Sequence, residues 1–354
     1  MQKQKRIVMA GTGALGGYIG GNLAHQGFDV TFVDMWQENL DAIRTRGLEL
    51  DGVTAEEKFT VKSGQTLHLD KIQELGKGRP VDIAFVSVKS YDTERVTKAI
   101  KPFLAADGYV VSLQNCINED TIAGIVGADR TLGVIASIIS VELYEAGKIR
   151  RMAAKGGDKH TVFRIGEMSG KVTDRVNELI AMFSLIDSTK ATTNLLGERW
   201  SKLIQNSMRN GVAAVTGLTS GECDTNESPR RFAIKVGGEG VQVADKLGVK
   251  LVGLGGMQPE QLAKASAGDA AAMAEVEKIM IARNASNPRA GIQRPSMAQD
   301  MKKGRRTEIE FMNGYIAAKG REVDIATPNN AKLVDLVLRM QRGELKPSAN
   351  ILDA

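Results

Sequence analysis

The sequence predicts an α/β protein of two domains, a first domain of alternating strands and helices and an all-α second domain. Short apolar runs alternate with amphipathic helical stretches in the first half of the chain, a pattern typical of a parallel, doubly wound sheet. Beyond Asn194 the helical stretches continue without a convincing strand. The 354 residues suffice for two complete hydrophobic cores. We therefore expect a boundary near residue 192, with domains 1–192 and 193–354.

The expected strands of the first domain are apolar runs bounded by turn residues. The first is "RIVMAG" at residues 6–11 and the second is "DVTFVD" at 29–34, with a turn and a helix between them. Later runs predict strands at 81–89, 108–115 and 130–139, a helix at 91–106 and a marginal strand at 159–167. Because strands and helices alternate, we expect crossover connections and a mostly parallel sheet.

Helical periodicity dominates the second half of the chain. No internal repeat or low-complexity tract interrupts it, and the alanine-rich "SAGDAAAMAE" fits a helix. The long stretches predict helices at 198–215, 232–246, 259–283 and 307–321.

Composition and charge restrict the class of partner. With 42% hydrophobic and 25% charged residues, the chain has the composition of an ordinary globular protein. The net charge of +5 favours a small anionic partner, whereas scattered basic residues and a 5% share of aromatic residues argue against nucleic acid. No apolar run approaches the ~20 residues of a membrane span, so we expect no membrane partner.

Cysteine and histidine usage bears on the compartment and on metals. Cys116 and Cys223 give no disulfide framework, which favours a reducing compartment. The stretch "MQKQKRIVMAG" lacks the apolar core of a signal peptide and runs directly into a strand. The three histidines, His25, His68 and His160, have no ligand spacing. We therefore expect a cytoplasmic protein without a metal site.

The stretch "GTGALG" carries the strongest motif of the first domain. Gly11, Gly13 and Gly16 form a G-x-G-x-x-G pattern that follows a strand and opens a helix. The three glycines permit a tight turn, approach of a pyrophosphate and close packing of helix on strand, and the helix N-terminus offers N–H donors to phosphate. The motif predicts a Rossmann dinucleotide-binding domain. Its cofactor-binding residues would be Gly11, Thr12, Gly13, Ala14, Leu15 and Gly16.

Asp34 bears on which dinucleotide is bound. It ends the second strand about 20 residues after the glycine motif, where a carboxylate can accept hydrogen bonds from the adenine ribose and repels a 2′-phosphate. The following "MWQENLDAI" contains no Lys or Arg before Arg44. We expect NAD(H) to be preferred, with NADP(H) as the alternative. The competing role for Asp34 is capping of the following helix.

The stretch "GERWSKLIQNSMRN" carries two stripes on one predicted helix. The apolar stripe consists of Trp200, Leu203, Ile204 and Met208. Lys202, Asn206 and Asn210 recur at every fourth residue and form a polar stripe beside it. On this helix alone, a solvated face is a better explanation of the polar stripe than a binding site.

Six motifs in order give the chain a resemblance to the ketopantoate reductases (2-dehydropantoate 2-reductases) over nearly its full length. They are "GTGALG", "VSVKSYDT", "SLQNCINED", "RWSKLIQNSMRN", "PSMAQDM" and "RRTEIEFMNGY". The resemblance implies a Rossmann domain followed by a helical domain, with the active site between them.

The resemblance also implies roles for single residues. Lys202 would be the general acid that protonates the substrate carbonyl oxygen, with Glu308 near it. Asn206 and Asn210 would bind the hydroxyl and carboxylate of the substrate, and Ser296 would help to hold the carboxylate. Lys89 and Asn115 would lie at the nicotinamide side, Asn115 in contact with both substrate and cofactor.

Departures from the family pattern leave the substrate open. Asn115-Cys116-Ile117-Asn118 replaces the usual Asn-Gly-x-Gly, Ser220 replaces a common asparagine, and the segment 252–295 is longer than its counterpart. Three alternatives remain: a reductase of ketopantoate itself, an NAD-linked dehydrogenase of another hydroxy acid or small alcohol, and an inactive cofactor-binding regulator. A homodimer is compatible with the sequence, which does not fix the assembly.

Overall fold

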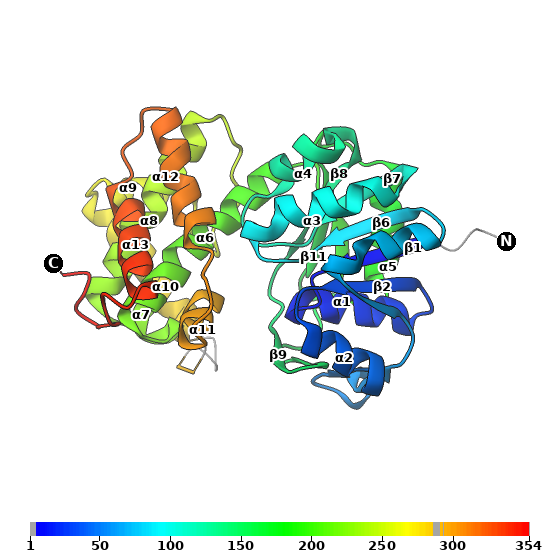
Figure 1. Cartoon of the computed structure of the whole chain (residues 1–354). Helices are drawn as coiled ribbons and strands as arrows, with labels where there is room; N and C mark the ends of the chain where they lie inside the picture. Colours follow the sequence, from blue (N-terminus) through cyan, green and yellow to red (C-terminus); the bar gives the residue numbers. More distant parts are fainter. Residues whose placement is uncertain (1–4, 286–290, 293, 354) are drawn as a thin grey trace. The chain divides into compact units, whose positions relative to one another are not determined.

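The computed structural model describes residues 5–285, 291–292 and 294–353, so part of the 252–295 segment lies outside the described residues. Contacts divide the chain into two compact units, Met1–Leu195 and Leu196–Ala354. The first unit is α/β and the second is helical, as the sequence predicts (Figure 1).

The first unit is built on an eight-stranded sheet. The pairs β1–β2, β1–β6, β6–β7, β7–β8 and β2–β5 are parallel, whereas β11 runs antiparallel to β8 and parallel to β12. The predicted doubly wound sheet and its marginal strand are therefore confirmed. The strand order is β12 (Thr189–Ala191), β11 (Phe163–Glu167), β8 (Thr131–Ala136), β7 (Leu104–Ser112), β6 (Val81–Val86), β1 (Arg6–Ala10), β2 (Asp29–Asp34) and β5 (Gln65–His68).

Helices cover both faces of this sheet because alternate strand residues point to opposite sides. In β1, Ile7 and Met9 join a core cluster that includes α1 (Ala14–His25) and α5 (Asp174–Ser184). Val8 and Ala10 join the opposite cluster, with α3 (Thr93–Ile100) and α4 (Glu119–Val126). The chain thus winds in both directions from β1, which leaves the carboxyl ends of the parallel strands along one edge.

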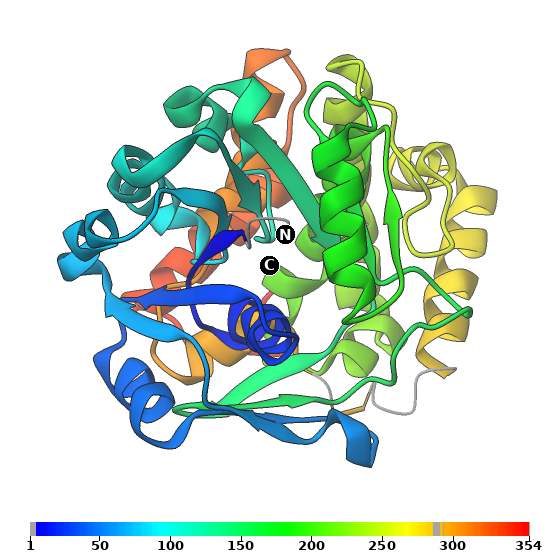
Figure 2. The same ribbon diagram turned by 90° about the vertical axis from the view of Figure 1, so that its right-hand side faces the viewer.

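A second, four-stranded sheet was not predicted. Its order is β4 (Phe59–Val61), β3 (Leu48–Asp51), β10 (Lys148–Arg151) and β9 (Val141–Glu145). It packs on the glycine-rich side of α1, where a Cβ at Gly17 would lie 2.4 Å from Ile149 and one at Gly21 would lie 2.9 Å from Leu48. Figure 2 shows this small sheet beside α1.

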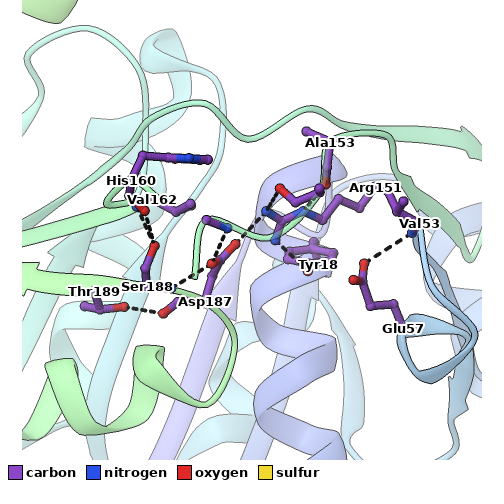
Figure 3. A network of polar contacts seen from close by, with 12 residues as sticks. Tyr18, Val53, Glu57, Arg151, Ala153, His160, Val162, Asp187, Ser188 and Thr189 are labelled. Atoms are coloured by element: carbon purple, nitrogen blue, oxygen red, sulfur yellow. Dashed lines mark hydrogen bonds and ion pairs between the residues drawn. The ribbon is translucent and has the colours of Figure 1, made fainter. Parts of the chain in front are cut away.

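A buried ion pair ties distant segments of the first unit together (Figure 3). Arg151 Nη2 lies 2.5 Å from Asp187 Oδ2, with side chains 0% and 1% exposed. Arg151 also donates to the Tyr18 hydroxyl of α1, at 3.1 Å. Burial raises the pKa of Asp187, but hydrogen bonds from the Ser188 backbone N–H and from Arg151 outweigh it and leave the pKa below its ordinary value. The pair therefore fixes the end of β10 to α1 and to the turn after α5.

The described residues of the second unit form helices, with one isolated bridge between Leu254 and Met257. None of the described helices is long and apolar enough to cross a membrane. The helices are α6 (Leu195–Thr216), α7 (Ser220–Thr225), α8 (Glu227–Lys246), α9 (Pro259–Ser266), α10 (Ala270–Ala285), α11 (Ser296–Lys302), α12 (Asn313–Glu322) and α13 (Pro328–Gln341).

Three predicted helices were too long. The stretch 91–106 is helical only to Phe103, and β7 begins at Leu104. The stretch 259–283 breaks at Gly268, whose φ of +97° belongs to the left-handed region that favours glycine. The stretch 307–321 begins with a short 3₁₀ turn over Ile309–Phe311, and α12 begins only at Asn313.

Candidate functional site

The glycine loop after β1 is tightly packed at two glycines and open at the third. A Cβ at Gly11, where φ is +95°, would lie 2.6 Å from the Ser87 carbonyl carbon. A Cβ at Gly16 would lie 2.0 Å from the Gly11 oxygen, whereas a Cβ at Gly13 would meet nothing within 4 Å. Gly11 and Gly16 therefore serve the turn and the packing, and Gly13 leaves space for a ligand against the backbone.

The N-terminus of α1 suits an anion. Its N-cap is Gly13, which forms no side-chain capping hydrogen bond, and no acidic residue lies in the first turn. Gly13, Ala14 and Leu15 are partly exposed. The N–H groups of a first helical turn and the helix dipole both attract phosphate. The loop therefore fits the pyrophosphate of a dinucleotide.

Asp34 holds this loop in place. Its Oδ2 accepts hydrogen bonds from the Thr12 backbone N–H at 2.6 Å and from the Thr12 hydroxyl. Its Oδ1 accepts from the N–H groups of Met35 and Trp36, at 2.7 and 3.1 Å. A carboxylate offers about four acceptor positions, and these four donors match them. The helix α2 (Gln37–Arg46) takes Trp36 as its N-cap, so the alternative role of Asp34 as the N-cap is wrong.

Asn39 is a site residue that sequence reasoning missed. Its side-chain amide donates to the Thr12 carbonyl and hydroxyl, at 3.2 and 3.0 Å, and its Oδ1 accepts from the Gly147 N–H at 2.8 Å. Thr12 and Asn39 are both fully buried. A lone asparagine in a helix gives no sequence signal for this contact, which joins positions far apart in the chain.

Lys89 and Asn115 follow neighbouring parallel strands, β6 and β7, and both are half-buried. The two loops are joined because the Gln114 side-chain amide donates to the Val88 carbonyl at 2.8 Å. The Asn118 side-chain amide donates to the Asn115 carbonyl, also at 2.8 Å. Both residues therefore lie along the carboxyl edge of the sheet, where ligands of such sheets bind.

Cys116 explains how this loop forms without the usual glycine. Its φ is +64°, in the left-handed region that glycine favours, and its side chain is buried. Asn118 donates from its amide to the Ser90 hydroxyl at 3.3 Å, and its Oδ1 accepts from the Thr93 hydroxyl at 3.3 Å. The tertiary contacts of Asn118 therefore stabilise a turn that Cys116 adopts at some cost in backbone energy.

Helix α6 of the second unit carries the two stripes as the sequence predicts. The apolar residues Trp200, Leu203, Ile204 and Met208 are all buried. Along the polar stripe, Lys202 and Asn206 are half-buried and Asn210 is 6% exposed. Burial at this level shows that the polar stripe is not a fully solvated helix face.

Glu308 lies in a segment that packs against α6. It is 7% exposed and precedes Ile309, whose side chain lies 3.5 Å from the Cβ position of Gly211. In the same segment, Asn313 donates to the Ser207 carbonyl at 3.3 Å. Glu308 is therefore a buried residue beside α6 and not part of an exposed helix.

Ser296 occupies a different environment. It is the first residue of α11 and is exposed, whereas the Met297 and Ala298 that follow it are buried. Arg294 donates to the Gly217 carbonyl at 2.5 Å, which ties the preceding segment to the chain just after α6. The structure thus groups Lys202, Asn206, Asn210 and Glu308 around α6, and places Ser296 on the neighbouring α11.

The fold and the glycine loop define the first unit as a Rossmann-type dinucleotide-binding domain. The sequence matches the family described as "Ketopantoate reductase PanE/ApbA" over residues 7–164 and "Ketopantoate reductase PanE/ApbA C terminal" over residues 194–341. The chain belongs to the ketopantoate reductase family. It is therefore an oxidoreductase that acts on a CH–OH group, in a family that depends on pyridine nucleotides.

Known relatives cover nearly the whole chain. The chain is 30% identical to a 2-dehydropantoate 2-reductase of Archaeoglobus fulgidus, over 96% of this chain and 99% of the relative. A 2-dehydropantoate 2-reductase of Halobacterium salinarum is also 30% identical, over 95% and 99%. The structure of a ketopantoate reductase from Ralstonia eutropha matches with a TM-score of 0.76 at 26% identity, covering 96% and 99%. D-mandelate dehydrogenase with NADH and anilino(oxo)acetate shares the fold, with a TM-score of 0.76 at 20% identity over 96% and 99%.

Proposed function

We propose that the protein transfers hydride between a nicotinamide nucleotide and a small 2-oxo or 2-hydroxy acid, with Lys202 as the general acid. The observation that carries this proposal is the half-buried polar stripe of Lys202, Asn206 and Asn210 on α6. Reduction of a ketone develops negative charge on its oxygen, so a positioned ammonium both stabilises that charge and supplies the proton. A solvated surface lysine would not need two carboxamides in register beside it.

The other residues are proposed to bind and orient. Asn206, Asn210 and Ser296 offer donors for the carboxylate and hydroxyl of the acid. Glu308, buried beside α6, would favour the charged form of the lysine. Lys89 and Asn115 are proposed to lie at the nicotinamide side, with Asn115 also near the substrate. The nicotinamide supplies the hydride, and residues 11–16 would hold its pyrophosphate. Under this proposal residues 1–192 bind the cofactor and 193–354 bind the substrate.

For the cofactor, we propose a preference for NAD(H) over NADP(H). The carboxylate of Asp34 lies at the end of β2, and no basic residue follows it before Arg44. A 2′-phosphate near this carboxylate is disfavoured by charge repulsion. Both oxygens of Asp34 already accept hydrogen bonds within the loop. The preference therefore depends more on repulsion of the 2′-phosphate than on a new hydrogen bond from the ribose.

For the substrate, two candidates are each favoured by an observation. The names of the relatives support ketopantoate. The departures at Cys116, Asn118 and Ser220 favour another acid, because each replaces a residue usual in the family at or near the expected site. Ser220 is here the first residue of α7, which a capping box of Thr219 and Glu222 begins. Oxidation of a hydroxy acid is the same chemistry in reverse.

The setting and assembly are also proposals. Both cysteines are buried thiols outside any disulfide, which supports a reducing, cytoplasmic compartment. The ketopantoate reductase of Staphylococcus aureus, which shares the fold at 14% identity, is described as dimeric. We propose a homodimer on this analogy of fold.

The test is a substrate screen followed at the nicotinamide absorbance. The purified chain is assayed with ketopantoate and a panel of 2-oxo acids, with NADH and NADPH, and in reverse with the hydroxy acids. We expect turnover of at least one 2-oxo acid, a higher kcat/KM with NADH, and a kcat/KM for ketopantoate below the ~10⁵ M⁻¹s⁻¹ of a dedicated enzyme. Absence of turnover with every acid in both directions would contradict the proposed reaction.

A further inference from the structure

The connection between β8 and β9 contains an isoleucine in a strained backbone conformation. Ile138 has φ +53°, in the left-handed region that glycine favours, and a side chain branched at Cβ is especially unfavourable there. Its side chain is 67% exposed, whereas the next residue, Ile139, packs against the core of the first unit. The fold therefore accepts backbone strain at a residue whose apolar side chain stays largely in solvent.

The chain on both sides holds Ile138 in this conformation. Before it, the Ser137 N–H donates to the Val162 carbonyl at 2.8 Å, which continues the pairing of β8 with the chain leading into β11. After it, the Ser140 carbonyl accepts from the Met152 N–H, also at 2.8 Å. A strained residue persists only where its surroundings determine it, and such residues are concentrated at ligand sites.

Ile138 lies at the edge of the sheet where the proposed cofactor residues lie. Strands β7 and β8 are parallel neighbours, with Ser112 opposite Gly133. Asn115 follows Ser112 by three residues, past the carboxyl end of β7. Ile138 follows Gly133 by five residues, past the carboxyl end of β8. Because neighbouring strands lie ~4.8 Å apart, Ile138 is next to the loop that we assign to the nicotinamide side.

The strand order separates the two halves of the dinucleotide. The order β5-β2-β1-β6-β7-β8 is that of dinucleotide-binding sheets, with the glycine loop after β1 near its middle. With the adenosine beside Asp34 at the end of β2, the nicotinamide half extends toward β6, β7 and β8. From Ile138 the chain enters β9, whose sheet packs on α1, so this connection runs back toward the helix that the glycine loop begins (Figure 2).

We propose that Ile138 packs against one face of the nicotinamide ring of the bound dinucleotide. The inference rests on the proposed function, because it names a further contact of the same cofactor. A flat ring suits an apolar surface, and a branched side chain on a fixed backbone loses little conformational freedom when the ring binds. Ile138 then excludes water from one face of the ring and leaves the other face open for hydride transfer.

The first test separates the nicotinamide from the rest of the cofactor. NADH and ADP-ribose, which lacks the nicotinamide, are titrated separately into the full chain by calorimetry. We expect Ile138→Gly to weaken NADH binding at least fivefold and to leave ADP-ribose binding within twofold of the wild type, and Ile138→Leu to retain part of the NADH affinity. The matched control is Asp324→Gly, at an exposed residue of the second unit with φ +57°. It should bind both molecules as the wild type does.

Each outcome of the titration decides the inference. Unchanged NADH affinity in Ile138→Gly would overturn the inference and leave the proposed function intact. Equal losses for NADH and ADP-ribose would show that Ile138 supports the loop and not the nicotinamide, and would also overturn it. A wild type that binds neither molecule would contradict the proposed cofactor and the inference together.

The second test asks whether Ile138 stabilises the fold. Ile138→Gly relieves the backbone strain and increases the freedom of the unfolded chain, two effects that oppose each other. We expect its midpoint of urea unfolding to be no lower than that of the wild type, together with the loss of NADH affinity. A clearly lower midpoint would show that the isoleucine side chain stabilises the fold, and would overturn the inference drawn from its strain.

Discussion

The glycine loop gives a sharp test because two of its glycines face opposite surroundings. Replacing Gly13 by alanine adds a methyl group that meets nothing within 4 Å, at an ordinary φ of −65°. Replacing Gly16 adds one that lies 2.0 Å from the Gly11 oxygen and 2.9 Å from the Ser87 Cβ. The first change is compatible with the fold and fills the space assigned to the pyrophosphate, whereas the second forces the backbone of the loop apart.

The magnitudes follow from these contacts. For Gly13→Ala, alanine is a poorer N-cap than glycine but reduces the entropy of the unfolded chain, so the free energy of unfolding should stay within ~0.5 kcal/mol of the wild type. For Gly16→Ala, overpacking typically lowers the free energy of unfolding by ~1–3 kcal/mol. The added methyl group meets backbone atoms that cannot move aside easily, so we expect a loss at the upper end of that range. A pyrophosphate pushed from the loop by a methyl group should lose at least ~1.4 kcal/mol, a factor of about ten in affinity.

The assay combines urea unfolding with titration of NADH followed by fluorescence. Gly124→Ala, in the exposed interior of α4 with nothing within 4 Å, is the matched control. It should bind NADH with the affinity of the wild type and unfold at a slightly higher urea concentration than the wild type. Gly13→Ala with unchanged NADH affinity would refute the assignment of this loop to the cofactor. Gly16→Ala with full stability would refute the packing role of Gly16.

Three further predictions concern stability, cofactor choice and thiols. Asp187→Asn breaks the buried pair with Arg151 and should lower the free energy of unfolding in urea by ~3–5 kcal/mol. Because the fold lowers the pKa of Asp187, its stabilising contribution is present above its unfolded pKa near 4 and is lost as the pH falls through the folded pKa, so the variant should lose less stability in acid than the wild type does. An equal loss of stability in acid for both proteins would contradict this. Asp34→Ser should reduce the ratio of NADH to NADPH affinity measured in parallel titrations. An unchanged affinity ratio would show that Asp34 does not select the cofactor. Burial raises the pKa of the Cys223 thiol to about 11, and Cys116 is also buried. Both thiols should therefore react with a disulfide reagent at pH 8 far more slowly in the native than in the unfolded protein, and a fast reaction of the native protein would contradict their burial.

Local patterns were sufficient to predict the glycine loop and six of the eight strands of the main sheet, but not β5 and β12. The positions of Gly11 and Gly16 after an apolar strand specify a turn and a close packing that only glycine permits, and the structure shows the contacts that require it. The buried stripe of α6 was predictable for the same reason, since helical periodicity reports directly on the buried face. Both features depend on residues close together in the sequence.

The errors lie where local signals compete or are weak. Gly268 follows the end of α9, and Asp269 caps α10 by accepting a hydrogen bond from the Ala272 N–H at 2.9 Å. The letters "SAGDA" contain this stop and start signal, but the alanine-rich helical pattern around them favoured one continuous helix. The second sheet was missed because its strands are three to five residues long.

Long-range pairings lay beyond the sequence for a different reason. Arg209 and Arg283 line one pocket although 74 positions separate them, and Arg151 meets Asp187 across 36 positions. No periodicity reports on such pairings, which only the tertiary fold brings together.

The central claim is that Lys202 donates the proton, and Lys202→Met tests it most directly. Methionine keeps the aliphatic stem and suits a helix, so the fold should tolerate it. Lys235→Met, at an exposed position of α8, is the matched control. With the best substrate of the screen, steady-state kinetics should show kcat reduced by ~10²–10⁴, with NADH affinity unchanged by titration and full activity in the control. If Lys202→Met kept more than about a tenth of the wild-type kcat, Lys202 would not be the general acid.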